Sequence, residues 1–557
     1  MTIEPGGAPA NRWGMVVDIQ KCVGCNTCTV ACKHSNVTPP GVQWRSVRDF
    51  EIGEYPNVER IFMPVGCMHC SEPPCMDVCP TTATRQREDG LVFQRYDLCI
   101  GCMYCHLACP YQARFLVSNE VGYFEGRRSS VEEVHYQDQR LGVSTKCTFC
   151  VEKVDEAKGT DLVPGIDGKV TPACVLSCIG QALHFGDFND PDSNISVMER
   201  DKASTRMHEE LGTKPNLVYV WHQPRDADGT PVPEPANRPA MKPIPAKRQD
   251  NWDLRAVGNF SLGGTSTGLL TLLGLIVLAG GGPALPSLEM MLAGIPLVFD
   301  LYHLGAALMG LGLFSVFLEI NRQARFLNVF MGYRTSWMSR EAIVAMLFMG
   351  VAALKLFAVT AALELLTTAS ELSLIASLLG AGFLYCQARI LQAAKGVPAW
   401  RSPVMTWMLV FSGLFEGLGL LVVALWVGGF MFPPDVAAAA PVAGLVLAAV
   451  NGVLWLKYMK HCADAVPVET LRVLSRHSPV IQIAGRGVPL VLFAVVLTLP
   501  VGSAPGLLAL AGLVAMLGGW YWKAVVVWRA CHSQNFHLKS VPLRGSGVMA
   551  APPHVTH

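Results

Sequence analysis

Sixteen cysteines in four groups constrain this chain more than any other feature, and all of them lie before residue 180. In chain order the groups are Cys22, Cys25, Cys28 and Cys32; Cys67, Cys70, Cys75 and Cys79; Cys99, Cys102, Cys105 and Cys109; and Cys147, Cys150, Cys174 and Cys178. Cysteines spaced at i, i+3 and i+6 converge on one point and cannot all pair with one another as disulfides. The spacing therefore indicates metal ligands.

Iron–sulfur clusters and structural zinc are the two kinds of metal centre that this spacing allows. A Cys-x-x-Cys-x-x-Cys loop supplies three thiolates to one [4Fe-4S] cluster, and the next cysteine ligates a second cluster, as in two-cluster ferredoxins. Zinc prefers two Cys-x-x-Cys pairs separated by a loop. The triple spacing, with Pro80 and Pro110 directly after two of the groups, favours iron–sulfur clusters. The spacing leaves open which groups exchange ligands.

Residues 13 to about 220 resemble the four-cluster iron–sulfur subunit of the dimethyl-sulfoxide-reductase type of molybdoenzyme. The resemblance rests on the four groups and on the stretches "GCMHCSEPPCMDVCP", "RYDLCIGCMYCHLACPYQARF", "KCTFC", "HFGDFNDPDSNIS" and "LGTKPNLVY". It implies an α+β ferredoxin-like domain over residues 1–220 that holds four [4Fe-4S] clusters. Because Cys102 is present where some relatives replace it, the resemblance implies four-iron clusters throughout.

The resemblance also implies which cysteines share a cluster. The implied sets are Cys22, Cys25, Cys28 with Cys178; Cys147, Cys150, Cys174 with Cys32; Cys67, Cys70, Cys75 with Cys109; and Cys99, Cys102, Cys105 with Cys79. Two features depart from the family pattern. The stretch "DEAKGTDLVPGIDGKVTP" lengthens the fourth group, and Ile179 follows Cys178 in place of a proline. Neither removes a ligand, and both are expected to alter the potential or the exposure of the nearest cluster.

A proline-rich linker over residues 221–257 separates the cysteine region from a series of long apolar runs over residues 258–530. Seven prolines between 221 and 252 favour extended backbone over a packed core. Runs near 20 residues predict an all-α bundle of eight transmembrane helices. They lie at roughly 260–281, 296–319, 342–363, 372–390, 404–430, 438–457, 487–502 and 505–528, followed by a tail at 531–557.

Lysine and arginine lie on alternate connections between these runs. The connections after the second, fourth and sixth runs and the tail are basic, whereas the regions near 282–295, 364–371, 431–437 and 503–504 contain no lysine or arginine. By the positive-inside rule, both termini and the cysteine domain are expected in the cytoplasm, with the anchor in the inner membrane. The N-terminal stretch "MTIEPGGAPANRWGMVVDIQ" agrees, since it has neither twin arginines nor a signal-length apolar run.

The stretches "INRQARFLNVFMGYRTSWMSREA" and "QARILQAAKGVPAWRSP" resemble the membrane anchor of the same enzyme family, which implies a quinone partner. No haem is expected, because axial histidines must face each other and only His303 lies well inside a predicted span. Ionisable residues at membrane depth are functional candidates by default. Here they are Asp300, His303, Glu319, Lys355 and Glu416.

Glu319 is the candidate nearest the cytoplasmic end, about 24 Å along a helix from His303. With it we group Arg322, Arg325, Arg334 and Trp337 as a candidate quinone site, where a carboxylate exchanges a proton and arginine polarises a carbonyl. The alternative is that these arginines only dock the soluble domain. His303 with Asp300 forms either part of a proton path or a satisfied buried pair.

Together these features predict a subunit that relays electrons through four [4Fe-4S] clusters between a separate molybdopterin catalytic subunit and membrane quinone. A cytoplasmic location points, within the resembled family, to sulfite oxidation. The alternatives are a relay for a reductase of a sulfur compound or N-oxide, with quinol as donor, and a redox-linked ion-translocating subunit. A net charge of +1 gives no reason to expect nucleic acid.

Overall fold

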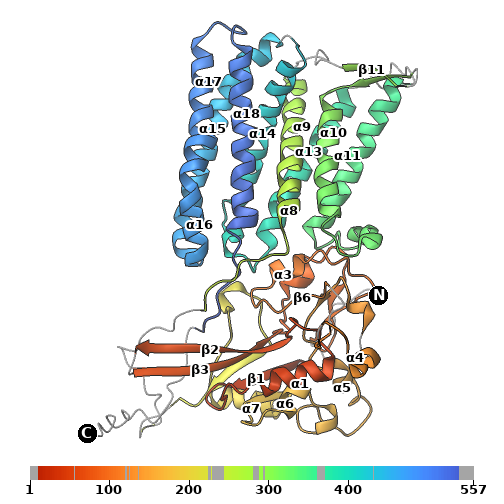
Figure 1. Cartoon of the computed structure of the whole chain (residues 1–557), viewed down its shortest axis with the longest axis vertical. Coiled ribbons are helices and arrows are strands. Elements are labelled where there is room, and N and C mark those ends of the chain that lie inside the picture. Colours follow the sequence, from red (N-terminus) through yellow and green to blue (C-terminus); the bar gives the residue numbers. More distant parts are fainter. Residues whose placement is uncertain are drawn as a thin grey trace.

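The computed structural model describes residues 11–54, 57–118, 122–124, 126–135, 137–223, 228, 244–279, 288–292, 295–360, 370–430 and 432–538. It has two stacked parts, an α+β domain from the N-terminal portion and a bundle of long helices above it in Figure 1. The predicted order of an α+β domain followed by a helical membrane bundle is confirmed.

The α+β domain contains a four-stranded sheet with the strand order β8-β1-β10-β9. Its strands are β1 (Trp13–Asp18), β8 (Leu183–Asp187), β9 (Ala203–Thr205) and β10 (Leu217–Trp221). β1 is parallel to β10 and antiparallel to β8, and both of its faces are buried. Met15 faces the cysteine loops, whereas Val16 packs with Ile195 of α7 (Asn194–Asp201). The sheet therefore joins the two ends of the domain and holds the cysteine groups between them.

Short elements surround the cysteines. The helices are α1 (Thr27–Asn36), α2 (Pro74–Asp77), α3 (Tyr104–Ala108), α4 (Ser130–His135), α5 (Val151–Asp155) and α6 (Ala173–Leu176), with 3₁₀ turns η1 (Asp138–Arg140), η2 (Gly168–Val170) and η3 (Glu209–Leu211). The two-stranded ladders are β2 (Arg45–Glu54) with β3 (Asn57–Gly66), β4 (Thr84–Gln86) with β5 (Val92–Gln94), and β6 (Phe115–Leu116) with β7 (Ser144–Thr145). Four of the helices carry cysteines of the four groups: α1, α2, α3 and α6.

The bundle contains helices that alternate in direction (Figure 1). Its elements are α8 (Leu254–Gly258), η4 (Asn259–Gly263), α9 (Gly264–Leu278), β11 (Leu288–Leu292), β12 (Ile295–Phe299), α10 (Leu301–Phe317), η5 (Gln323–Phe330), α11 (Trp337–Thr360), α13 (Ser370–Ala393), η6 (Pro398–Arg401), α14 (Met405–Val427), α15 (Pro434–Ala465), α16 (Val468–Pro479), η7 (Val480–Gly487), α17 (Val488–Thr498), α18 (Pro505–Ala524) and η8 (Val525–Arg529). The turns η4, η7 and η8 are π-helical and continue the helices beside them.

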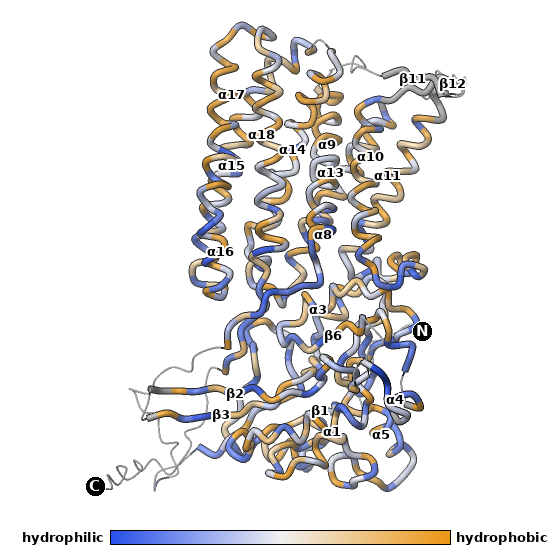
Figure 2. The backbone as a smooth tube through the Cα atoms, in the orientation of Figure 1, coloured by the Kyte–Doolittle hydropathy of each residue, from blue (hydrophilic) through white to orange (hydrophobic). Residues whose placement is uncertain are grey.

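Within the described residues, seven helices are long and apolar enough to cross a membrane, and the 17-residue α10 is a shorter apolar helix. Figure 2 shows apolar residues along these helices and polar residues where they meet the α+β domain. Each predicted run therefore corresponds to a helix. A 17-residue helix rises about 26 Å, a little less than the hydrocarbon thickness of a bilayer.

Several predicted boundaries differ from the structure, and two of the differences have a clear physical cause. The run at 296–319 becomes a helix only at Leu301, because the Asp300 side chain accepts hydrogen bonds from the backbone of Tyr302 and His303 and so caps α10. The run at 487–502 is only the end of a continuous helical segment over Val468–Thr498. Its first part was missed because α16 is amphipathic and carries charged residues.

The end of the linker and the start of the tail run side by side over the α+β domain. Ile244 pairs with Phe536, and Arg248 pairs with His532, in isolated β-bridges. Phe536 and Leu538 enter the core of the cysteine domain. The tail thus fastens the domain to the bundle. Linker residues 224–227 and 229–243, and tail residues 539–557, lie outside the described residues.

Candidate functional site

The four cysteine groups fold into four sets, each with one member from a distant group. Cys22, Cys25, Cys28 and Cys178, here called set 1, line one cavity with an empty volume of about 330 Å³. Cys67, Cys70, Cys75 and Cys109, called set 3, line another of about 340 Å³. Folding therefore brings four sulfur atoms around a common space in each case.

In the other two sets the cysteines lie close enough for their charges to act on one another; Asn36 Nδ2, for example, lies 3.7 Å from Cys32 Sγ and 3.8 Å from Cys150 Sγ. Burial raises the pKa of Cys32 far above its usual value, and Cys147, Cys174 and Cys150 add to the rise; these four are set 2. Burial likewise raises the pKa of Cys102, with further contributions from Cys105, Cys79 and Cys99; these are set 4. These groupings correspond to the sets that the family resemblance implies, and the binding of one cluster by each set stays a prediction.

Neighbouring sets are joined in a fixed order. Cys28 of set 1 and Cys32 of set 2 lie one turn apart on α1. His69, between two set 3 cysteines, is 3.1 Å from the carbonyl oxygen of Cys147 in set 2. Cys105 and Cys109 lie on and just after α3 and join set 4 to set 3. The sets therefore form a row from set 1 to set 4.

The chemistry of these sulfur atoms fits iron–sulfur clusters. Burial raises the pKa of Cys22 to about 11 and those of Cys99 and Cys174 to about 12. Burial of these thiols disfavours their ionisation, whereas bound iron supplies the positive charge that stabilises thiolates. Backbone N–H groups point at the sulfur atoms, as from Thr84 to Cys79 (3.4 Å).

Loop geometry at set 4 depends on a glycine. Gly101 lies between two set 4 cysteines and has φ of +70°, a conformation that favours glycine. A Cβ atom there would lie 2.2 Å from the carbonyl oxygen of Gly142. The close approach lets the set 4 loop pack against the Gly142 turn and present Cys102 to the bundle.

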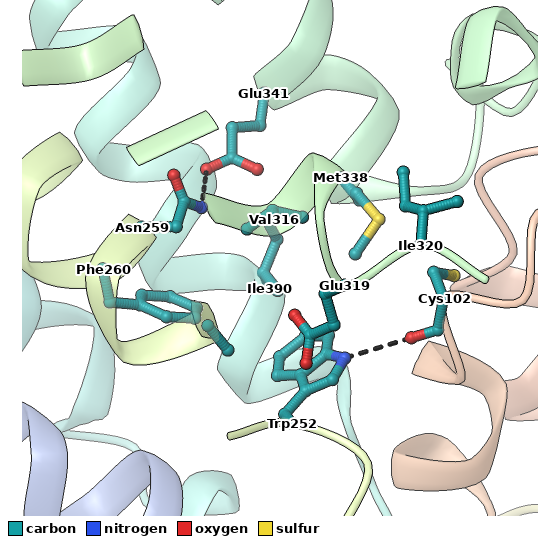
Figure 3. A pocket seen from close by; sticks show the side chains of 11 residues that line it. Cys102, Trp252, Asn259, Phe260, Val316, Glu319, Ile320, Met338, Glu341 and Ile390 are labelled. Carbon is teal, nitrogen blue, oxygen red and sulfur yellow. Dashed lines mark hydrogen bonds between the residues drawn. The ribbon is translucent and has the colours of Figure 1, made fainter. Parts of the chain in front are cut away.

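A pocket of about 420 Å³ lies where set 4 meets the bundle (Figure 3). Its walls come from the linker end, α8, η4, α10, α11, α13 and the set 4 loop. The lining residues are Cys102, Trp252, Ala256, Asn259, Phe260, Val316, Glu319, Ile320, Met338, Glu341 and Ile390. A largely apolar pocket with a few polar groups is typical of a small-molecule site.

Polar atoms in this pocket remain unpaired in the described part of the chain. The Asn259 amide donates to Glu341 Oε1 (3.3 Å), but Asn259 Oδ1 and Glu319 Oε1 are buried with no hydrogen-bond partner. Buried polar atoms nearly always have partners in folded proteins. The two oxygens are therefore placed to meet a ligand that carries hydrogen-bonding groups.

Glu319 lies two residues beyond the last residue of α10, at the junction of the two parts. Burial, and then the nearby charge of Asp253, raises the pKa of its carboxyl to about 8. A carboxyl group in this range can hold or release a proton near neutral pH.

The arginines grouped with Glu319 lie elsewhere. Arg322 donates to the carbonyl of Leu141 (2.8 Å), and Arg325 donates to those of Tyr96 (2.6 Å) and Cys99 (3.2 Å). Both therefore dock the cysteine domain and do not line the pocket.

Arg334 and Trp337 also lie outside the lining of the pocket. Arg334 is exposed and bonds the Tyr333 hydroxyl. Trp337 packs under the guanidinium groups of Arg340 and Arg389.

His303 lies in the first turn of α10, at the end of the bundle away from the cysteine domain (Figure 1). Its Nδ1 is 2.8 Å from Asp300 Oδ1, and Lys355 Nζ is 3.0 Å from Asp300 Oδ2. These three residues form a capped ionic cluster, separate from the pocket. A second ionic pair, Glu416 with Lys523, is fully buried inside the bundle.

Sequence reasoning missed Trp252, Asn259 and Glu341 as pocket residues. Trp252 and Asn259 sit at the boundary between linker and first span, where apolar periodicity says nothing about function. Glu341 offered a signal, because a charged residue at the start of a predicted span is a functional candidate, but it falls within the basic loop motif and does not stand out there.

Comparison with known proteins identifies both parts. Residues 58–124 match the family described as "4Fe-4S dicluster domain", and residues 253–457 match "DMSO reductase anchor subunit (DmsC)". A selenate reductase subunit of Mesobacillus selenatarsenatis is 41% identical over 221 residues, covering 38% of this chain and 72% of the relative. A sulfite dehydrogenase subunit of Allochromatium vinosum is 38% identical over 222 residues (37% and 81%). The menaquinone reductase iron-sulfur cluster-binding subunit of Nitratidesulfovibrio vulgaris is 35% identical over 227 residues (38% and 88%).

Proposed function

We propose a function from the premise that this chain belongs to the family of iron–sulfur electron-transfer subunits of dimethyl-sulfoxide-reductase-type complexes, fused here to the membrane anchor of that family. We propose that it holds four [4Fe-4S] clusters, one in each cysteine set. It relays electrons between a molybdopterin-containing catalytic subunit and quinone in the membrane. The observation that carries this proposal is the row of cysteine sets that begins at an exposed surface and ends at the junction pocket.

Set 1 is the proposed contact with the catalytic subunit. Cys25 is exposed, and the nearby side chains of Val23 and Ile179 are 58% and 70% exposed. Exposed apolar side chains around a redox centre suit a protein partner. Ile179, which stands where the family pattern has a proline, thus contributes to this exposed apolar surface.

Set 4 and the pocket are the proposed contact with quinone. The cluster supplies single electrons, and the pocket residues supply position and protons. Glu319 is placed to give a proton to one quinone oxygen, and Asn259 with Glu341 to bond the other end. The apolar walls, with Phe260 and Ile390, suit a ring, and the name of the menaquinone reductase relative supports a quinone as the occupant.

We further propose that the cysteine domain and both termini face the cytoplasm. The basic connection between α10 and α11 contacts the cysteine domain through Arg322 and Arg325, at the end of the bundle that meets this domain (Figure 1). Basic connections favour the cytoplasmic side of an inner membrane.

Sulfite is the proposed substrate of the catalytic partner, with electrons flowing to quinone, since the resembled family places sulfite oxidation on the cytoplasmic side and a sulfite dehydrogenase subunit is among the relatives. A reductase with quinol as donor is the second candidate, favoured by the 41% identical selenate reductase subunit. In either case two electrons and two protons accompany each quinone–quinol conversion.

Purification of the complex from its native membrane tests the proposal. A molybdenum-containing chain should co-purify, and sulfite should reduce an added quinone. Glu319→Gln should slow quinone turnover far more than turnover with an artificial dye, which bypasses the pocket. Absence of a molybdenum subunit, or equal loss of both activities in Glu319→Gln, would contradict the proposed relay.

A further inference from the structure

We infer that Trp252 is the positioning residue that joins the set 4 cluster to the quinone pocket, an inference that rests on the proposed function. Its indole N–H donates to the carbonyl oxygen of Cys102 (3.1 Å), a set 4 residue, while its ring lines the pocket (Figure 3). Trp252 is 4% exposed. One side chain thus contacts both the set 4 loop and the proposed quinone pocket.

The hydrogen bond fixes the position of Cys102 relative to the pocket. Among the cysteines of the four sets, Cys102 alone lines this pocket. A donor on its carbonyl holds the loop against the bundle and draws electron density from the peptide next to the ligating sulfur. Hydrogen bonds around a cluster help to set its reduction potential. Trp252 is therefore expected to influence both the distance and the energetics of electron transfer.

The backbone around Trp252 is held in turn by the C-terminal tail. The Gln249 side chain accepts a hydrogen bond from the backbone N–H of Trp252 (2.9 Å) and donates one to the backbone carbonyl of Trp252 (3.0 Å). The same side chain donates to Cys531 Sγ (3.1 Å), and the Gln249 backbone N–H donates to the Cys531 carbonyl (3.0 Å). The linker and the tail together present the indole, so its placement does not depend on the pocket ligand.

An aromatic stack fixes the plane of the ring. Trp252 stacks with Tyr104 of α3 (centroids 5.4 Å apart) and with Trp400 (5.9 Å). Tyr104 lies two residues from Cys102, and its hydroxyl donates to Ile390 O (2.6 Å). The stack spans the junction from the set 4 helix to the bundle, with Trp252 in the middle. Offset aromatic contacts of this kind are favourable beyond their buried area.

Trp400 supplies a matched control. It belongs to the same stack and is fully buried, and its indole N–H donates to the carbonyl of Val526 (2.9 Å). It neither lines the pocket nor bonds a cysteine loop in the described structure. Trp400→Phe therefore makes the same chemical change as Trp252→Phe, one ring away.

The test uses the full complex, purified anaerobically, with its clusters reduced and then mixed with a short-chain naphthoquinone. Reoxidation of the set 4 signal is followed by freeze-quench electron paramagnetic resonance and scaled to dye-coupled activity of the same preparation. Each quinone takes up two electrons, one from each of two successive cluster oxidations, and two protons from the pocket and solvent. A redox titration gives the midpoint potential, and binding of the naphthoquinone is measured separately by equilibrium titration.

Trp252→Phe should slow reoxidation about fivefold, the effect of one net hydrogen bond, and should shift the set 4 potential alone. Trp252→Leu should slow it further and weaken naphthoquinone binding, because the ring is lost. Trp400→Phe keeps an aromatic ring against Trp252 and leaves the Cys102 hydrogen bond intact, so it should match the unaltered protein in all three measurements.

An unshifted potential with normal reoxidation in Trp252→Phe would overturn the inference, as would equal slowing in Trp400→Phe. Failure of the unaltered protein to bind or be oxidised by the naphthoquinone would instead reject the quinone site itself. The two failures are thus distinguishable.

Discussion

Removal of one member of the buried pair Glu416–Lys523 should destabilise the bundle far more than removal of both. Lys523 Nζ is 2.8 Å from Glu416 Oε2 and also donates to the Phe260 carbonyl at 2.8 Å. Glu416 further accepts from Ser412 (2.7 Å) and Thr265 (2.8 Å). Both charged side chains are 0% exposed, so neither can turn to water when its partner is lost.

The magnitude follows from this burial. Lys523→Met leaves a buried carboxylate without a counter-charge, which costs about 3–5 kcal/mol for a buried pair. Glu416→Gln with Lys523→Met leaves no charge and removes the Lys523 donor from the Phe260 carbonyl, which costs about 1–3 kcal/mol. At roughly 2–4 °C per kcal/mol for a unit of 150–250 residues, the single variant should melt on the order of 10 °C lower and the double variant only a few degrees lower.

Thermal unfolding of the detergent-solubilised protein, followed by intrinsic fluorescence, checks this order. The half-buried ionic cluster provides a comparison, between the single variant Lys355→Met and the double variant that also carries Asp300→Asn. Asp300 is 26% exposed, so the difference in melting temperature between single and double variants should be smaller there. Equal melting temperatures for the single and double Glu416–Lys523 variants would refute the reasoning, since the uncompensated charge would then carry no penalty.

Three further predictions concern the redox path. Quinone reduction by the unaltered protein should slow as pH rises through about 8, because the carboxyl of Glu319 has a raised pKa and loses its proton there; Glu319→Gln should show no such step in a pH–rate profile. Cys102→Ser should remove or alter one cluster signal in the electron paramagnetic resonance spectrum, whereas Cys386→Ser, at a buried cysteine outside the four sets, should leave the spectrum unchanged. Arg325→Ala loses two hydrogen bonds to the cysteine domain, on the order of 1–3 kcal/mol, and should speed hydrogen exchange around residues 96–100; Arg334→Ala should not, and equal exchange in both variants would argue against docking by Arg325.

The cysteine sets and the helical bundle were predictable because their signals are local and repeated. Thiolate spacing limits the ligand geometry, and an apolar run near 20 residues has few folded alternatives. The membership of the sets came from family resemblance, since spacing allowed neighbouring groups to exchange as well. The extent of the seventh span was missed because amphipathic α16 hides the continuity of the helix.

The junction pocket was only partly predictable. Glu319 is a candidate from sequence because of its charge at predicted membrane depth, and it lines the pocket. Arg322 and Arg325 have the same sequence signature as ligand-binding arginines, yet they bond backbone carbonyls of the cysteine domain. Trp252 depends on a contact between residues 150 positions apart. Such contacts depend on how the cysteine domain packs against the helical bundle, and local sequence periodicity does not predict them.

Iron and sulfide content of anaerobically purified protein, measured with zinc in the same sample, tests the central claim most directly. Four filled sets predict about sixteen iron atoms and about sixteen sulfides per chain, with zinc near zero. A zinc-containing protein, or one with far fewer irons after anaerobic purification, would contradict the row of clusters on which the relay depends.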